Sequence, residues 1–320
     1  MQLGDILLFS RTSRMSPNCL PMEGTVITVF GGTGYLGRRI GESLANRELA
    51  VRVAVRNPTG FSDRRAEGLV EYVKADVRDP SAVERAVQGA SAVVNVVGLY
   101  LEIGEDTFES VHVVGARNVA AAAANSGAGR LVHISGIGAN VQSESAYVRA
   151  RGKGEVAVRE AFPMSSVVRP SALFGQADAL LRTFDRIVRA SPLIPLFGDG
   201  SSRLQPVYVG DVAAAVSTLA VEPAASFELF ELGGPHIYAY RELYRRIEAH
   251  RGRRRTYIPI PFAVWMAMAR TLSILPRPPL TVDQLALVRE DNIVHKGVST
   301  FSDLGIAPRS LDELLPECLP

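Results

Sequence analysis

The stretch VITVFGGTGYLGRRIG, from Val26 to Gly41, decides the fold. A short β-branched run leads directly into three glycines with the spacing G-x-x-G-x-x-G, and a helix-forming sequence follows. Glycine permits a tight turn and lets the backbone approach a pyrophosphate, whose charge then meets the free N–H groups at the start of the helix. We therefore predict that Gly31, Gly34 and Gly37 form the phosphate-binding turn of a dinucleotide site. The alternative is a strand-to-helix turn without a ligand.

Strand-like and helix-like patterns alternate downstream of this turn. Strand patterns lie at 25–30, 50–55, 69–75, 91–97, 130–135 and 164–170, and helix patterns begin at Tyr35, follow Pro80, cover about 107–125 and surround Tyr147. This alternation predicts the α/β class, with a Rossmann-type doubly wound parallel sheet. After Pro170 the pattern loosens into Pro- and Gly-rich connections such as SPLIPLFGDG (191–200), which predict a smaller C-terminal lobe.

These patterns predict three segments. We expect an extension over 1–21, an NAD(P)-binding Rossmann domain over 22–175 with a returning segment near 203–232, and a C-terminal lobe formed by most of 176–320. The extension is either a floppy or misassigned start before Met22 or a weak targeting peptide, since it carries Arg11 and Arg14 but also Asp5.

The composition excludes several classes of protein. Of the 320 residues, 47% are hydrophobic and 21% charged, as in globular chains, and the net charge of +2 is too balanced for a nucleic-acid partner. The two cysteines, Cys19 and Cys318, lack metal-ligand spacing, so we expect no metal. The run RGRRR, 251–255, is locally basic: it is either a solvated helix end or loop, or a contact for an anionic partner such as lipid headgroups.

No apolar run is long enough to predict a membrane-spanning helix. The nearest candidate covers 257–276 and is interrupted by Pro259, Pro261 and Arg270. It predicts an apolar helix over about 261–274. That helix is either buried in the C-terminal lobe or makes a peripheral contact with a membrane protein or the bilayer surface.

The end of the second predicted strand indicates which cofactor is preferred. Arg56 lies there, 19 residues after Gly37. An acidic residue would bond the adenosine ribose and repel a 2′-phosphate, whereas a guanidinium can bind that phosphate through paired hydrogen bonds. NADP(H) is therefore the preferred cofactor, with NAD(H) as the alternative. Asp76, followed by Val77 at the end of the third strand, is placed to meet the adenine amino group.

The spacing of a serine and a tyrosine raises the question of catalysis. Ser135 follows a predicted strand, and Tyr147 lies 12 residues later on a predicted helix, as in short-chain dehydrogenases/reductases. Proton transfer would require the pKa of that phenol to fall by about 3 units, and a lysine one helical turn later normally supplies much of this shift.

The lysine of this chain is in the wrong register for that role. Residue i+4 is Arg151, about 40° around the helix from Tyr147, whereas Lys153 at i+6 lies about 240° around it. The positive charge of Arg151 faces the tyrosine, but its rigid fork is expected to fit a compact lysine position poorly. We therefore expect a vestigial or weak catalytic set formed by Ser135, Tyr147 and Arg151, and leave open whether the chain is an enzyme.

With these residues in view, the chain resembles the atypical short-chain dehydrogenase/reductase family. Within it, the chain is similar to the nucleotide-binding accessory subunits of respiratory complex I and their bacterial relatives. The resemblance extends from about Thr25 to Leu315 and includes VFGGTGYLGRR (29–39), VRVAVRNP (51–58), LVHISGIGA (131–139) and VVRPSALFG (167–175). The more discriminating motifs are LQPVYVGDVAAAV (204–216) and PPLTVDQLALVREDN (278–292).

The resemblance implies an extended-type fold that holds NADPH tightly, with a lobe that docks where the two arms of complex I meet. By position, the implied cofactor contacts are Gly31, Thr33, Gly34, Tyr35, Leu36, Gly37, Arg56, Asp76, Val77, Tyr147, Pro170 and Phe174. The implied location is cytoplasmic and peripheral at the inner face of the respiratory membrane, or the matrix side in a mitochondrion. Relatives often have lysine where this chain has Arg151, which weakens an enzymatic interpretation.

Two functions stay open on this evidence. The first is an NADP(H)-binding accessory or assembly subunit of complex I in which the cofactor is structural. The second is an NADP-dependent reductase, epimerase or dehydratase-like enzyme acting on a small or quinone-like substrate, in a cleft that the apolar Phe262, Trp265, Met266 and Met268 would line.

Overall fold

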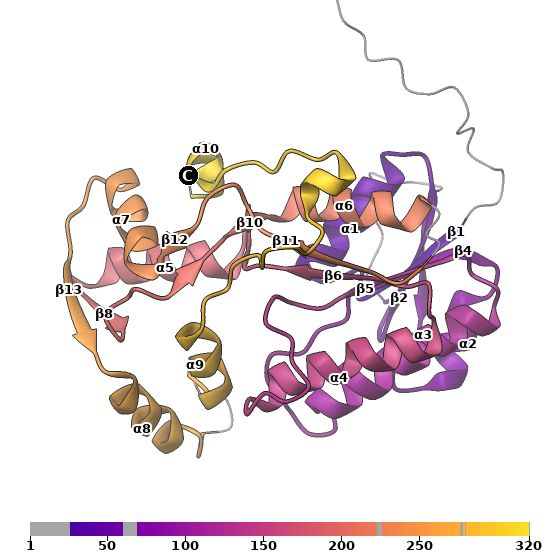
Figure 1. Cartoon of the computed structure of the whole chain (residues 1–320), viewed down its shortest axis with the longest axis horizontal. Coiled ribbons are helices and arrows are strands. Elements are labelled where there is room, and N and C mark those ends of the chain that lie inside the picture. Colours follow the sequence, from indigo (N-terminus) through magenta and orange to yellow (C-terminus); the bar gives the residue numbers. More distant parts are fainter. Residues whose placement is uncertain (1–25, 60–68, 223–225, 276–277, 279, 320) are drawn as a thin grey trace, which may run out of the picture.

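The computed structural model describes residues 26–59, 69–222, 226–275, 278 and 280–319. Their central feature is a seven-stranded sheet with the order β11-β6-β5-β4-β1-β2-β3, in which every neighbouring pair of strands is parallel (Figure 1). The strands are β1 (Val26–Phe30), β2 (Ala50–Val55), β3 (Val70–Lys74), β4 (Ala90–Asn95), β5 (Arg130–Ile134), β6 (Ser166–Pro170) and β11 (Glu228–Leu232). This sheet confirms the predicted doubly wound fold.

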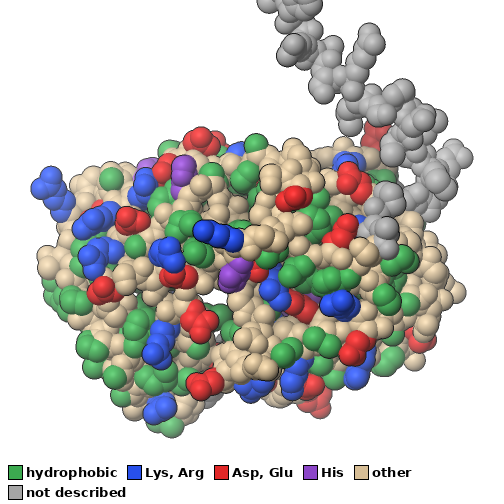
Figure 2. Space-filling model, viewed as in Figure 1, with side chains coloured by type: hydrophobic (Ala, Val, Ile, Leu, Met, Phe, Trp, Pro, Cys, Tyr) green, Lys and Arg blue, Asp and Glu red, His purple; other side chains and the backbone are tan. Residues whose placement is uncertain are grey.

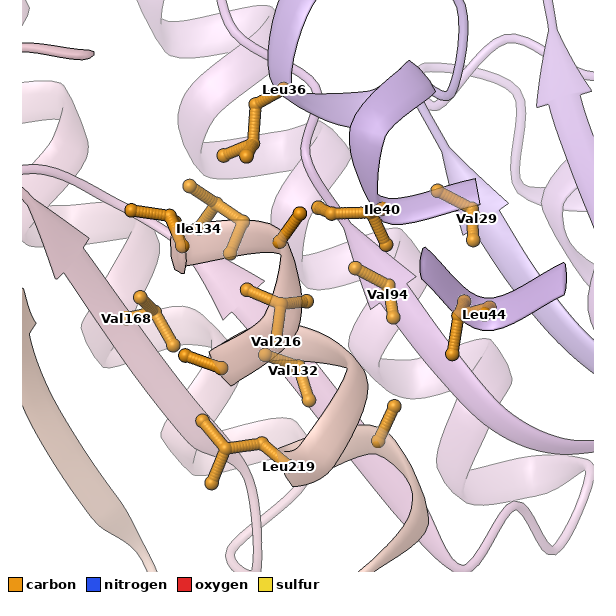
Figure 3. Packing of buried hydrophobic residues seen from close by; sticks show 14 of the residues in the cluster. Val29, Leu36, Ile40, Leu44, Val94, Val132, Ile134, Val168, Val216 and Leu219 are labelled. Carbon is orange, nitrogen blue, oxygen red and sulfur yellow. The ribbon is translucent and has the colours of Figure 1, made fainter. Parts of the chain in front are cut away.

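Helices cover both faces of the sheet (Figure 1). One face carries α1 (Tyr35–Ala45) and α6 (Val209–Val221), and the other carries α2 (Pro80–Val87), η1 (Glu109–Gly115), α3 (Ala116–Asn125) and α4 (Ala146–Ala161). Figure 3 shows side chains of β1, β4, β5 and β6 packed against side chains of α1 and α6. Val94 of β4, Ile40 of α1 and Val216 of α6 are among them, and none of the three is exposed to solvent. Each such aliphatic side chain stabilises the fold by about 1.5–3 kcal/mol.

On the opposite face α4 and η1 approach each other closely at a glycine. A Cβ atom at Gly154 of α4 would lie 2.1 Å from the carbonyl oxygen of His112 in η1. The predicted long helix over about 107–125 is confirmed in its extent, since the helical run is unbroken from 108 to 125, but 109–115 form a π-helix before α3 begins. The wider turn lies where the chain meets Gly154, and such turns are frequent at functional sites.

The segments after β6 build most of a lobe with its own apolar core. They comprise β7 (Leu173–Phe174), α5 (Ala179–Ala190), β8 (Leu193–Phe197), β9 (Arg203–Leu204), β10 (Val207–Tyr208), β12 (Tyr238–Ala239), α7 (Tyr240–His250), β13 (Thr256–Ile260), α8 (Phe262–Leu272), α9 (Val282–Arg289) and α10 (Leu311–Cys318). η2 (Phe301–Leu304) packs instead in the core of the sheet, beside α6. The core residues include Leu181, Ile194, Leu196 and Leu243.

The expectation of simple connections over 191–200 is wrong, because β8 lies there and pairs in parallel with β13. Burial alternates along β8, which places Ile194 and Leu196 in the core of the lobe, while Leu193 and Pro195 are exposed. Proline is tolerated in such an edge strand because it does not have to donate a ladder hydrogen bond. The two prolines of this region hide a strand from pattern analysis.

The chain returns from the lobe to the sheet twice. β11 pairs with β6, and the N–H of Glu231 then donates to the carbonyl of Ser299 at 2.9 Å. Glu231 also accepts from His295 and Arg169, so a carboxylate that is 1% exposed joins the C-terminal segment to the sheet. The predicted boundary at residue 175 and the lobe over 176–320 stay predictions, and the predicted extension over 1–21 lies outside the described residues.

Candidate cofactor site

The turn between β1 and α1 is shaped for an anion without using a charged side chain. Gly31 has a φ of +79°, which favours glycine, and a Cβ atom at Gly37 would lie 2.2 Å from the carbonyl oxygen of Gly31. The first turn of α1 therefore packs directly on the glycine turn. Gly31 is needed for its positive φ and Gly37 for the close approach of the helix, as predicted for a phosphate-binding turn.

The start of α1 also leaves backbone donors for a ligand. Gly34 is the N-cap and makes no side-chain hydrogen bond, and the first turn contains no acidic residue. The N–H groups of Tyr35, Leu36 and Gly37 precede the first intrahelical donor, which is the N–H of Arg38 bonded to the carbonyl oxygen of Gly34, and they point out of the helix end. The carbonyl oxygen of Thr33 accepts from Arg38 Nε at 2.8 Å, which fixes the turn. These residues fit a pyrophosphate group.

At the other side of β1 and β2, two arginines share one carboxylate. Arg56 Nη1 lies 2.7 Å from Asp106 Oδ2, and Arg78 Nη1 lies 2.9 Å from Asp106 Oδ1. Arg78 also binds Asp76 through its backbone N–H and its guanidinium. The structure thus brings the predicted Arg56 and Asp76 together, and adds Arg78 and Asp106, which the sequence analysis missed.

This cluster changes the expected role of Asp76. Hydrogen bonds from Arg78 hold the pKa of the Asp76 carboxyl below its usual value, so the group is ionised and turned towards Arg78 rather than presented alone to an adenine. Val77 has a buried side chain, and its carbonyl oxygen accepts from Asn118 Nδ2 at 2.9 Å. The predicted adenine contacts remain predictions.

Tyr147 lies at the base of a second cluster, at the N-terminal end of α4. Its ring is 6% exposed and stands 5.5 Å from the ring of Tyr100, 5.5 Å from that of Phe108 and 5.6 Å from that of His112. The sequence analysis did not find Tyr100, Phe108 or His112, because they come from a loop and a π-helix that carry no recognisable catalytic spacing. Together they enclose the phenol.

Arg151 occupies the position at which related enzymes have lysine. Its guanidinium carbon lies 5.1 Å from the centre of the Tyr147 ring. A Cβ atom at Gly136 would be 3.1 Å from Arg151 Nη1, and one at Gly98 would be 3.7 Å from Nη2. The expectation of a poor fit is therefore wrong, because two glycines beyond the ends of β4 and β5 leave room for the fork.

The electrostatics of this corner do not favour proton transfer. Burial raises the pKa of the Tyr147 phenol well above its usual value, and the opposing charge of Arg151 does not reverse the shift. Burial likewise lowers the pKa of His112 to about 4 and that of His133 to about 3, helped in both cases by Arg151. The corner holds one half-buried cation beside neutral rings.

Three buried polar atoms near Arg151 have no hydrogen-bond partner among the described residues. They are Ser135 Oγ, His133 Nδ1 and Arg151 Nε. Buried polar groups are normally paired, so such a set indicates a place where a ligand or water completes the bonding. The predicted Ser135 is therefore available to a ligand, and His133 is a further candidate that its place within a strand concealed.

Three further positions from the sequence analysis have different surroundings. Lys153 is exposed while Tyr147 is buried, in agreement with the helical geometry that excluded it. Pro170 ends β6 at the same edge of the sheet as the cluster. Phe174, in contrast, is fully buried in the lobe core, where its ring lies 5.7 Å from that of Tyr208, so only its backbone can contact a cofactor.

The helix that reaches Tyr147 is not the one expected to line a substrate cleft. Trp265 of α8 donates to the carbonyl oxygen of Leu196 at 3.0 Å and lies over Phe197, so α8 packs on β8. Instead α9 reaches the tyrosine: Leu287 packs against the cluster of Phe108 and Tyr147. The expected lining by Phe262, Trp265, Met266 and Met268 is thus replaced by α9 at this corner.

Two classes of site find no support in the part of the chain that the structure describes. It contains no group of three or more His, Cys, Asp or Glu side chains that could hold a metal ion. None of its helices has the length and apolar character needed to cross a membrane. Cys318 is a buried free thiol, and Cys19 lies outside the described residues.

Comparison with known proteins agrees with this geometry. Residues 31–182 match the family described as NAD(P)H-binding. The chain is 30% identical over 305 residues to NADH dehydrogenase [ubiquinone] 1 alpha subcomplex subunit 9, mitochondrial, of Arabidopsis thaliana, covering 91% of this chain and 76% of that protein. It is also 35% identical to ceramide reductase of Caulobacter vibrioides, over 190 residues and 59% of each chain.

The fold has relatives of known structure. A nucleoside-diphosphate-sugar epimerase from Staphylococcus aureus superimposes with a TM-score of 0.71, over 91% of this chain and 99% of that one, at 19% identity. Such low identity supports the extended short-chain dehydrogenase/reductase fold alone, and function has to be argued from the site.

Proposed function

Because this chain belongs to the family of NADH dehydrogenase [ubiquinone] 1 alpha subcomplex subunit 9, we propose that it is an NADP(H)-binding accessory or assembly subunit of respiratory complex I. The cofactor stabilises the folded subunit and is not turned over. By mass action, a cofactor present at about 100 times its dissociation constant adds about 2.7 kcal/mol to the free energy of unfolding.

The observation that carries this proposal is the state of Tyr147. A phenol that donates or accepts a proton near neutral pH needs a lowered pKa, and burial raises the pKa of this one. Arg151 stacks against the ring and fills the space between Gly98 and Gly136. A corner built in this way can hold a nicotinamide ribose through Ser135, Tyr147 and Arg151 without moving a proton.

When bound, the cofactor supplies the nicotinamide ring that carries a hydride. We propose that it lies along the carboxyl ends of the strands. The phosphates meet the backbone of residues 31–37, with Gly31, Thr33, Gly34, Tyr35, Leu36 and Gly37 as contacts, while Asp76 and Val77 border the adenosine and Tyr147 and Pro170 border the nicotinamide. Residues 22–175 form the nucleotide-binding domain in this proposal, and β11 completes its sheet.

The preference for NADP(H) over NAD(H) rests on the charges beyond β2 and β3. Arg56 is largely exposed, with 68% of its side chain accessible, and shares Asp106 with Arg78. A 2′-phosphate can replace Asp106 as the acceptor for both guanidinium groups, which a ribose hydroxyl cannot do equally well because it carries no charge. Arg78 thereby joins Arg56 as a determinant of the preference.

The contact with complex I is proposed to involve α8. Ala269 is the buried residue of this helix, whereas Val264 and Met268 are 47% and 43% exposed. An apolar helix left open to solvent favours the predicted contact with a partner or the membrane surface over the predicted burial. The protein would then lie at the inner face of the respiratory membrane, or on the matrix side in a mitochondrion.

One experiment tests both parts of the proposal. The full chain is released from its host membranes in mild detergent, and its migration with membrane-bound NADH dehydrogenase is followed with and without NADPH. Co-migration is expected. The bound nucleotide is then extracted and identified, with NADP(H) expected. The proposal would be contradicted if the chain migrated separately from NADH dehydrogenase even with saturating NADPH. It would also be contradicted if the purified chain carried no nucleotide.

The similarity to ceramide reductase supports a second candidate, an NADP-dependent reductase. The native protein and Arg151→Lys are compared by following NADPH absorbance with a panel of ketones and quinones. We expect no turnover by the native protein, and a gain in turnover in the variant alone, because lysine restores the usual arrangement behind Tyr147. Turnover by the native protein would establish the reductase instead.

A further inference from the structure

The C-terminal lobe concentrates positive charge in two short segments. Residues 179–190 and 240–255 together contain ten arginines and three acidic residues, a net charge of +7, although the whole chain carries only +2. The remaining residues therefore carry a net charge of −5. Figure 2 shows Lys and Arg side chains gathered on the side of the molecule where α5 and α7 lie. A difference of this size within one chain indicates a site for an anion.

A pocket of about 580 Å³ lies between these segments and the end of α10. Its charged lining consists of Arg182, Asp185, Arg186, Arg189, Arg251 and Arg253, so five guanidinium groups face one carboxylate. Cys318 and Leu319 border it on the side of α10. The volume is in the range of pockets that hold small molecules.

The spacing along α5 explains how the arginines come together. Arg182, Arg186 and Arg189 follow one another at i, i+4 and i+7, which places them on one face of the helix. The loop after α7 brings Arg251 and Arg253 to the same face, where Arg253 donates to the carbonyl oxygen of Arg189 at 3.4 Å. Like charges repel at these distances, so the fold holds an unfavourable arrangement in place.

The single carboxylate is already engaged. Asp185 is 8% exposed and accepts from Arg251 Nε at 2.7 Å, with Arg189 Nη1 at 3.7 Å. Arg182, Arg186 and Arg253 form no ion pair with any residue in the described part of the chain. Three exposed guanidinium groups thus remain beside the Asp185–Arg251 ion pair, which has no net charge.

We propose that this pocket binds a ligand with two or more phosphate charges, at a site separate from the cofactor cleft. Guanidinium groups match phosphate oxygens with paired, charge-assisted hydrogen bonds, and several forks around one pocket favour a compact polyanion. The ligand is a phosphate ester, carried either by a phospholipid headgroup or by a soluble metabolite. The basic run 251–255 is then part of a binding site rather than a solvated loop.

The test uses inorganic pyrophosphate as the probe and calorimetry as the measurement, in low salt. Saturating NADPH is present throughout, so that the glycine turn at 31–37 does not contribute. The variant R182Q/R186Q/R253Q removes the three arginines without ion pairs, all of which are exposed, and is expected to fold normally. Its matched control, R85Q/R117Q/K153Q, removes the same charge from exposed positions on α2, α3 and α4.

We expect the native protein and the control to bind pyrophosphate with the same affinity, and the pocket variant to bind at least about tenfold more weakly. Raising the salt concentration should weaken binding by the first two. Equal affinities for both triple variants, or no saturable binding by the native protein, would overturn the proposal. Unchanged melting temperatures confirm that the comparison concerns binding and not folding.

Flotation with vesicles separates the two sources of the phosphate. Native protein is mixed with phosphatidylcholine vesicles that do or do not contain phosphatidic acid. Binding only to the phosphatidic-acid vesicles, with release by pyrophosphate and loss in the pocket variant, identifies a lipid headgroup. Pyrophosphate binding without flotation identifies a soluble phosphate ester, and both results support the site.

Discussion

The two ends of the proposed cofactor cleft present charge in different ways. At the glycine turn the available groups are backbone N–H groups of α1, whose first turn packs so closely on Gly31 that a Cβ atom at Gly37 would lie 2.2 Å from the Gly31 carbonyl oxygen. At the opposite end the groups are side chains: the guanidinium of Arg151 stacks on Tyr147, and its charge helps to lower the pKa of His112 and of His133. The first end suits a bound diphosphate, whereas the second suppresses ionisation of its phenol.

This contrast teaches that holding a cofactor and using it depend on separate parts of the fold. A chain can keep the backbone geometry of the first end intact while substitutions at the second end change what happens to the nicotinamide. Gly37→Val and His133→Phe each change one of these ends and so break the contrast or define it more sharply. Arg56→Asp and Asp106→Asn change the arginine–carboxylate cluster beyond β2 and β3, which is proposed to decide the nucleotide that the first end receives.

The largest effect is expected for Gly37→Val. The new side chain would collide with the backbone at Gly31, which cannot move without opening the turn, so NADPH binding should fall below detection and the free energy of unfolding should fall by about 1–3 kcal/mol or more. Gly41→Ala is the control on the same helix, since no atom lies within 4 Å of its Cβ position. The control should bind normally and gain about 0.5–1 kcal/mol. Fluorescence titration and thermal unfolding measure both quantities, and native-like binding by the valine variant would contradict the cradle.

Arg56→Asp should reverse the choice of cofactor. The ratio of NADPH to NADH affinity is expected to fall by about ten- to a hundredfold, with the exposure of Arg56 favouring the lower value. Titration with each nucleotide provides the measurement. Arg85→Asp, at an exposed position on α2, makes the same charge change elsewhere. A ratio that stays constant in Arg56→Asp would show that this arginine takes no part in the selection.

His133 makes the Tyr147 end sensitive to acid. Its pKa falls from 6.5 to about 3 on folding because it is buried, so the unfolded chain binds the proton first and stability is lost as the pH drops below about 6.5. Between pH 7 and pH 5 this costs about 2 kcal/mol, since one pKa unit corresponds to about 1.4 kcal/mol. Over this range the free energy of unfolding of His133→Phe, measured by urea unfolding, should therefore fall by about 2 kcal/mol less than that of the native protein. The exposed His236→Gln is the control, and identical pH profiles for native protein and His133→Phe would contradict the assignment.

The smallest effect is expected for Asp106→Asn. Neutralising this carboxylate frees Arg56 and Arg78 for a 2′-phosphate, so NADPH should bind about two- to fivefold more tightly while NADH affinity stays unchanged. Asp303→Asn is a suitable control, since Asp303 lies at η2, in another part of the chain. Weaker NADPH binding in Asp106→Asn would mean that Asp106 itself orients the two arginines for the ligand.

The sequence was sufficient to predict the parallel sheet, because strands and helices alternate and their periods differ. It also predicted that Arg151, and not Lys153, faces Tyr147, since helical geometry is the same in any sequence. It could not predict β8, where Pro195 interrupts the strand pattern and Pro192 precedes it, or the π-helix before α3, whose residues have an ordinary helical period.

The site was less predictable than the fold. Tyr100, Asp106, His112 and Leu287 reach it from a loop, a π-helix and α9, so their approach depends on tertiary packing and leaves no local spacing. Phe174 shows that a shared position does not determine which atoms are used. The resemblance implied a cofactor contact there, and because the ring packs in the core of the lobe, that contact stays a prediction for the backbone alone.

The attachment of the C-terminal segment to β11 has a consequence for synthesis on the ribosome. The hydrogen bond between Glu231 and Ser299 and the ion pair between Asp211 and Arg309 join β11 and α6 to a segment that is translated well after them. The sheet and its covering helix therefore lack these contacts while that segment is still inside the exit tunnel. Until it emerges, this part of the nascent chain should remain more open to chaperones and proteases.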